Sequence, residues 1–125
     1  MSVLDQNIAI FKYFEEISKI PHGSFHEEKI ADYIESFAKE HDFKYVRDDM
    51  NNVIIYKGAT PGYENHDTVM LQAHMDMVCE KTEDCTIDFE KDGLDLYVDG
   101  DFLRAKGTTL GGDDGIAVAY GLALL

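Results

Sequence analysis

The stretch LQAHMDMV, residues 71–78, holds the side chains with the clearest chemical potential. His74 and Asp76 stand near the end of an apolar run, with one residue between them. In a strand, residues two apart project from the same face, so both side chains would point together. A neutral imidazole is a good zinc ligand, and a neighbouring carboxylate can hold one ring nitrogen while the other faces a metal. A purely structural pair near a strand end gives the same pattern, so the H-x-D spacing alone does not decide.

A second group of acids lies in LGGDDG, residues 110–115, directly before an apolar helical segment. Asp114 suits the N-cap of that helix, because aspartate is a favoured capping residue. Capping does not explain Asp113, whose carboxylate could bridge two cations as in hydrolytic sites with two metals. Ligand sites in open α/β sheets collect beyond the carboxyl ends of strands. We therefore predict that His74, Asp76 and Asp113 converge in space.

The elements that must position these residues follow from periodicity. Apolar residues at spacings of three and four predict a helix over 6–19 and a second helix that ends near residue 40. Ser24 followed by Glu27 fits a capping box at the start of the second helix. Segments 43–49 and 51–59 read as two strands, and 94–107 as a hairpin that turns at Asp99-Gly100-Asp101.

Two segments are apolar on all sides. The run 68–78 is nearly continuous, which predicts a strand covered on both faces. The segment 116–125, IAVAYGLALL, predicts a helix without a polar face, and such a helix is normally buried. Since little of this chain could cover that helix, we expect the chain to be the front part of a longer protein. We also expect exposed apolar surface and a homo-oligomer.

Composition excludes several classes of function. The 125 residues carry 25 acids against 11 bases, a net charge of −14, and this field would repel nucleic acid. No apolar stretch reaches the length of a membrane span, and the N-terminus lacks the features of a signal peptide. Cys79 and Cys85 do not form a CxxC pair. We expect two reduced thiols in a cytoplasmic protein that binds neither nucleic acid nor membranes.

The order of the motifs is more informative than any one of them. HMD, an acidic insert, the hairpin DGDFLRAKG and then GTTLGGDDG opening a helix form one long pattern. It resembles the front of the co-catalytic zinc exopeptidases, and more narrowly the aminoacyl-histidine dipeptidases (Xaa-His dipeptidases). The stretch ISKIPHGSFHEEKIADYI is similar to the opening helices of that family. The resemblance covers nearly the whole chain, and DGDFLRAKGTTLGGDDGIAVA is its most specific part.

The resemblance implies a role for each candidate residue. His74 would ligate one zinc ion, Asp113 would bridge two, and Asp76 would be the catalytic residue that orients and polarises the imidazole. Cobalt or manganese could replace zinc. The peptide bond between Asp113 and Asp114 would be cis, as is typical after the bridging aspartate. The family's paired glutamates, another acidic ligand and a distant histidine are not in this sequence, so the chain should bind metal poorly and catalyse nothing by itself.

The fold implied by the resemblance is α/β, with a mixed β-sheet flanked by helices on both faces. Residues 1–125 would be the N-terminal part of the catalytic domain, and the rest of that domain and a lid or dimerisation domain would lie outside them. The implied activity is hydrolysis of Xaa-His or similar dipeptides by a metal-activated water, in the cytoplasm.

Two other functions fit parts of the pattern. Paired aspartates also hold magnesium in phosphatases, but magnesium prefers oxygen ligands, which His74 does not supply. A non-catalytic acidic interaction module would leave both motifs without metal. Among the other candidates, His22 and His26 are four residues apart and could form a metal pair, although a polar surface position is the simpler interpretation. Lys106 could meet a substrate carboxylate or lie on the surface near a turn.

Overall fold

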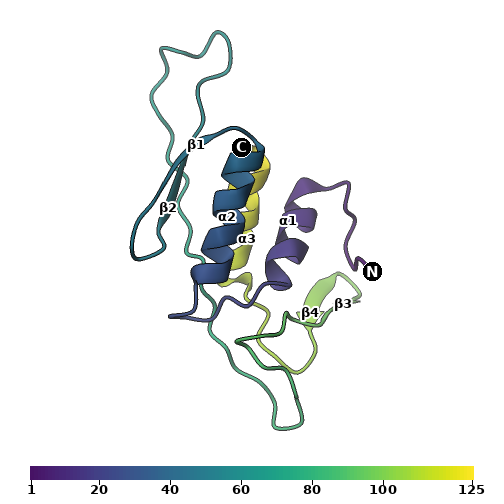
Figure 1. Cartoon of the computed structure of the whole chain (residues 1–125). Coiled ribbons are helices and arrows are strands. Elements are labelled where there is room, and N and C mark those ends of the chain that lie inside the picture. Colours follow the sequence, from purple (N-terminus) through teal and green to yellow (C-terminus); the bar gives the residue numbers. More distant parts are fainter.

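The computed structural model describes all of residues 1–125. It contains three helices and two antiparallel hairpins (Figure 1). In chain order the elements are α1 (Ala9–Ser18), α2 (Glu28–Glu40), β1 (Lys44–Arg47), β2 (Val53–Tyr56), β3 (Leu96–Asp99), β4 (Phe102–Ala105) and α3 (Gly112–Leu124). The helices run alongside one another at the centre, with β1–β2 and β3–β4 at separate places on the periphery. No helix is long and apolar enough to cross a membrane.

The apolar faces of the three helices share one core, as their spacing predicts. The buried members of this core are Phe14, Ile17, Ile30, Ile34, Phe37, Val118, Ala119 and Leu122. Burial of each large apolar side chain contributes about 1.5–3 kcal/mol relative to leaving it in water. The most extensive contact between helices joins α1 to α3, where the Phe14 ring lies against Gly115 and a Cβ at that glycine would come within 3.3 Å of the ring. This contact holds the start of α3 against α1.

The two predicted strands over 43–59 pair as one antiparallel hairpin, and the predicted hairpin over 94–107 is also present. In the first, Lys44 pairs with Tyr56 and Arg47 with Val53. In the second, only Gly100 and Asp101 separate the two strands, and Gly100 has the positive φ of +61° that such a tight turn requires. The positions of these hairpins follow from local pattern alone, which is why the sequence predicts them well.

The predicted strand over 68–78 is not formed. Val69, Met70 and Leu71 are 80%, 85% and 58% exposed, and the one bridge in this run pairs Met77 with Gly23. Neither hairpin is hydrogen-bonded to the run, so its backbone groups have no strand ladder, and its side chains from Val69 to Leu71 have no cover. The class is α/β, but the strands form two separate two-stranded sheets rather than a mixed sheet.

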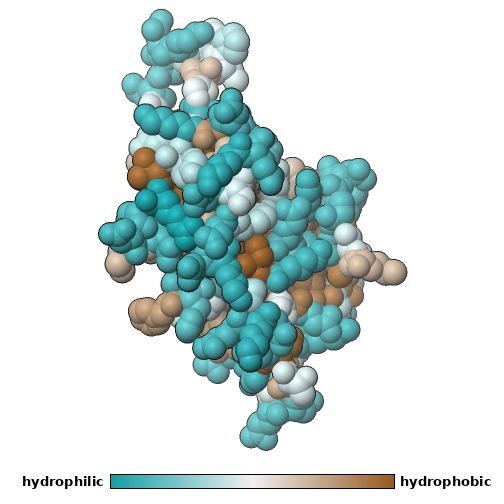
Figure 2. Space-filling view, viewed as in Figure 1, coloured by the Kyte–Doolittle hydropathy of each residue, from teal (hydrophilic) through white to brown (hydrophobic).

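Helix α3 is apolar on both sides, and only one side is covered. Ile116, Tyr120 and Leu124 are spaced by four residues and are 41%, 51% and 63% exposed. Residues at this spacing form a stripe along one helix face. The expectation of exposed apolar surface is confirmed, and Figure 2 shows hydrophobic patches within an otherwise hydrophilic surface.

Candidate metal centre

The three predicted site residues lie together. The Nε2 atom of His74 is 3.0 Å from Oδ1 of Asp113, although 39 residues separate them in the chain. The other ring nitrogen, Nδ1, is 3.0 Å from Oδ1 of Asp76. The predicted convergence is therefore confirmed, and it arises without a strand because the loop after residue 71 passes the start of α3.

The loop before α3 aims Asp113 at this imidazole. Gly111 precedes it with φ of +74°, a conformation that glycine adopts at no steric cost. The peptide bond between Asp113 and Asp114 is cis, as the resemblance implies. The N-cap prediction for Asp114 is wrong, because α3 has no side-chain cap hydrogen bond. Its carboxylate instead accepts a hydrogen bond from the backbone N–H of His74 at 3.3 Å, which ties the two loops together.

Asp76 is held from its other side by a residue that the sequence did not assign to the site. The Ser24 hydroxyl donates a hydrogen bond to Oδ2 of Asp76 at 2.6 Å. The capping-box prediction is wrong, because α2 begins after Glu27 without a side-chain cap hydrogen bond. The S-x-x-E pattern cannot distinguish a serine that caps a helix from one that bonds to Asp76, because Asp76 lies 52 residues away in the chain.

Of the other candidate residues, His22 is buried, whereas His26 and Lys106 lie on the surface. His22 is buried, at 4% exposure, so the surface position predicted for it is wrong. Its Nδ1 lies 2.6 Å from the carbonyl oxygen of Ile20, and burial lowers the pKa of the imidazole. His26 is exposed and lies 3.7 Å from Glu90. Lys106 forms an exposed ion pair with Asp95 at 3.3 Å, so both of these are surface residues.

Hydrogen bonding fixes the charges within the centre. Partial desolvation lowers the pKa of His74, but the hydrogen bonds to Asp113 and Asp76 outweigh it and raise the pKa above its ordinary value. The Ser24 hydroxyl holds the pKa of Asp76 below its usual range, and the His74 imidazole acts in the same direction. Asp76 is therefore an ionised acceptor at neutral pH, and its Oδ1 is placed to accept a hydrogen bond from a proton on Nδ1 of His74.

Comparison with known proteins agrees with this arrangement. No family model matches the chain. The chain is 48% identical over 116 residues to the cytosol non-specific dipeptidase of Escherichia coli (strain K12). It superposes with a TM-score of 0.90 and 49% identity on the crystal structure of aminoacylhistidine dipeptidase from Vibrio alginolyticus.

The chain is a relative of these dipeptidases. Each match covers 93% of the chain but only 24% of the relative, so the chain spans about a quarter of the length of either protein.

The candidate ligands of this dipeptidase relative are of the types that zinc prefers, but there are too few of them for a complete zinc site. Two ligands of one tetrahedral zinc ion, each about 2.0–2.1 Å from it, lie about 3.3 Å apart. The 3.0 Å between Nε2 of His74 and Oδ1 of Asp113 is close to that separation. However, no group of three or more His, Cys, Asp or Glu side chains is arranged to hold a metal ion. A catalytic zinc site needs at least three protein ligands.

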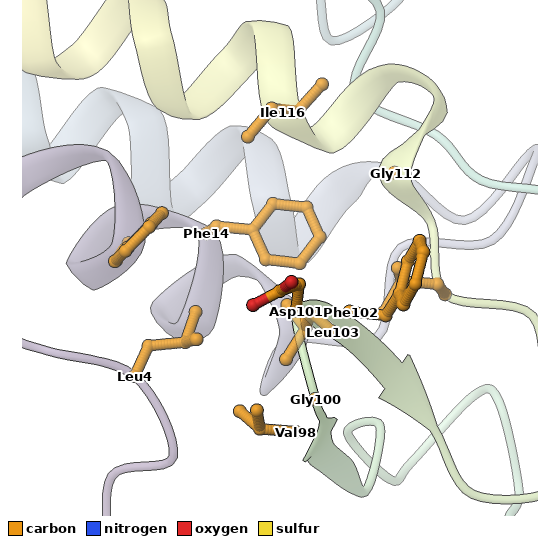
Figure 3. Close-up of a pocket in the computed structure, with 11 residues that line it drawn as sticks. Leu4, Phe14, Val98, Gly100, Asp101, Phe102, Leu103, Gly112 and Ile116 are labelled. Atoms are coloured by element: carbon orange, nitrogen blue, oxygen red, sulfur yellow. The ribbon is translucent and has the colours of Figure 1, made fainter.

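A separate cavity reaches Gly112, the residue before Asp113, but its lining has a different character. A cavity of about 350 Å³ lies between α1, the β3–β4 hairpin and the start of α3 (Figure 3). Phe14, Val98, Phe102 and Ile116 are among its mainly apolar lining. Asp101 is the charged residue of that lining, so the cavity offers no cluster of metal ligands.

Proposed function

We propose that the chain is part of a zinc-dependent dipeptidase in which His74 and Asp113 are metal ligands and Asp76 orients the imidazole. One observation carries the proposal. Nδ1 of His74 is taken by Asp76, and Nε2 lies on the other side of the ring, 3.0 Å from the Asp113 carboxylate. A carboxylate that fixes one ring nitrogen and leaves the other for a metal is a recurrent design in zinc enzymes.

The extent of the chain is part of the proposal. Residues 1–125 would form the N-terminal part of the catalytic domain, and the general base and remaining ligands would come from further residues. In the complete enzyme the run 68–78 would pair as a strand in a mixed sheet with helices on both faces. The exposed apolar edge of Val69, Met70 and Leu71 supports this, because such a run is stable only when it is paired and covered. The enzyme would be a cytoplasmic homo-oligomer.

The residues of this chain would bind and orient rather than transfer protons. Asp113 is 95% exposed, so both its oxygens can reach cations in the open space before α3. Asp76 would orient the imidazole through Oδ1, which lies 3.0 Å from Nδ1. Zinc bound there would supply Lewis acidity and a water of lowered pKa. The substrate would be an Xaa-His or similar dipeptide, consistent with the names of the two relatives.

The test uses the complete enzyme, stripped of metal with a chelator and then loaded with zinc, cobalt, manganese or magnesium. We expect zinc, cobalt or manganese to restore hydrolysis of an Xaa-His dipeptide, with two ions bound per chain. The variant His74→Ala should lose turnover and zinc, whereas His66→Ala, which changes an exposed histidine in a distant loop, should keep both.

Three results would contradict the proposal. Near-normal activity of His74→Ala would remove the proposed ligand. Phosphate-ester hydrolysis restored by magnesium alone would favour the phosphatase alternative. A complete protein that binds no divalent metal and cleaves no dipeptide would favour the interaction module.

A further inference from the structure

We propose that Ser24 is a positioning residue of this centre, because its hydroxyl holds Asp76 in the orientation that keeps the His74 imidazole aimed at the metal. The inference rests on the proposed function, since it assigns Ser24 a part in the same site. It places a residue of the segment between α1 and α2 in the chemistry of a loop that is 52 residues away.

Each oxygen of the Asp76 carboxylate has its own hydrogen-bond partner. Oδ2 accepts the Ser24 hydroxyl at 2.6 Å, and Oδ1 lies 3.0 Å from Nδ1 of His74. The terminal torsion of an aspartate is broad and sets no orientation on its own. With one oxygen fixed by Ser24, rotation of the carboxylate would break a strong charge-assisted hydrogen bond. Ser24 therefore limits the positions of the carboxylate that contacts Nδ1 of His74 together with the backbone carbonyl of Asp76, which lies 3.1 Å from the same nitrogen.

Backbone hydrogen bonds hold Ser24 beside Asp76. Met77 donates a backbone hydrogen bond to the carbonyl of His22 at 2.9 Å, and Ser24 donates one to the carbonyl of Met77 at 3.3 Å. These two bonds fix Ser24 beside residue 76. Gly23 permits the close approach, since a Cβ there would lie 2.9 Å from Sγ of Cys79.

The hydroxyl of Ser24 has no competing use in the helix that follows. Helix α2 has no side-chain cap hydrogen bond, although Ser24 and Glu27 match the capping-box pattern. Glu27 instead accepts the backbone N–H of Phe25 at 2.8 Å. The Ser24 side chain is thus directed away from α2 and towards Asp76, which a purely helix-capping role would not require.

The test compares Ser24→Ala and Ser24→Thr in the complete enzyme. Zinc affinity is measured by competition with a chelator, and ligand geometry by the visible absorption of the cobalt-loaded enzyme. We expect Ser24→Ala to weaken zinc binding about tenfold, the lower end of the range for residues that orient metal ligands. The cobalt spectrum should change, and Ser24→Thr, which keeps the hydroxyl, should restore both.

Ser18→Ala is the matched control. Ser18 is buried, whereas Ser24 is half-buried, and the Ser18 hydroxyl donates to the carbonyl of Phe14 at 2.9 Å without contact to the centre. This variant should lose stability but keep zinc affinity and the cobalt spectrum. If Ser24→Ala does not fold, Ser24→Cys, which retains the side-chain size with a weaker donor, should still bind zinc less tightly.

The outcomes separate the two proposals. Unchanged zinc affinity and cobalt spectrum in Ser24→Ala or Ser24→Cys, with zinc lost in His74→Ala, would overturn the role of Ser24 alone. Normal zinc binding by His74→Ala would overturn the proposed function as well. In an Asp76→Asn background, Ser24→Ala should cause no further tenfold loss, because both changes disrupt the same chain of contacts.

Discussion

Gly111 is the position at which a single methyl group should disturb the centre most selectively. Its φ is +74°, and a Cβ would lie 2.9 Å from Sδ of Met77 and 3.4 Å from Nε2 of His22. Left-handed backbone costs a residue with a Cβ about 1–2 kcal/mol. Met77 is only 3% exposed, and crowding of a packed interior adds about 1–3 kcal/mol. Gly111→Ala should therefore lower the free energy of unfolding by about 2–5 kcal/mol.

The control separates backbone strain from the crowding of the site. Gly62 has φ of +93°, but a Cβ there would meet nothing within 4 Å. Gly62→Ala should therefore lower the free energy of unfolding by only about 1–2 kcal/mol, the cost of the left-handed backbone, and should leave zinc affinity unchanged. The assay is urea unfolding of the complete enzyme together with zinc titration. Equal losses of unfolding free energy in the two variants, or normal zinc affinity in Gly111→Ala, would show that His22 and Met77 do not hold the loop before α3 in place.

Three further predictions concern the scaffold. Arg47 lies 2.9 Å from Glu35 and lowers the pKa of that carboxyl to about 2. The stability contributed by this pair is therefore complete above the ordinary pKa near 4.5 and is lost as the pH falls towards 2. The difference between the urea midpoints at pH 7 and pH 3 should be smaller in Arg47→Ala than in the unchanged protein. Leu124→Lys should reduce self-association of the 125-residue chain in sedimentation, since Leu124 ends the exposed stripe of α3; unchanged association would place the contact elsewhere. Phe14→Ala should destabilise the folded state by about 3–5 kcal/mol in urea unfolding, because Phe14 joins α1 to α3 in the core; a loss below about 1 kcal/mol would contradict that role.

Local signals in the sequence were sufficient for most elements. The helices follow from apolar spacing, and the second hairpin follows from Asp99-Gly100, because a tight turn needs a positive φ within two residues. The run 68–78 has an equally strong apolar pattern, yet it joins neither sheet. A strand depends on partners far along the chain, and its own composition does not reveal whether they are present.

The same distinction applies to the centre. The convergence of His74 and Asp113 was predicted from the order of the motifs, because two loops with ligand-type residues precede a helix and follow an apolar run. The contacts of Ser24 and Asp114 were not predicted, since both residues also match a helix-cap pattern that is recognised from neighbours alone. Their actual partners lie 52 and 40 residues away.

The most direct test of the proposed zinc ligands is anomalous diffraction at the zinc edge from crystals of the complete enzyme. We expect a zinc peak about 2.0–2.1 Å from Nε2 of His74 and at a similar distance from a carboxylate oxygen of Asp113. His74 Nδ1 should stay on Asp76. Zinc bound elsewhere, with Nε2 of His74 still hydrogen-bonded to Asp113, would contradict the proposed ligands.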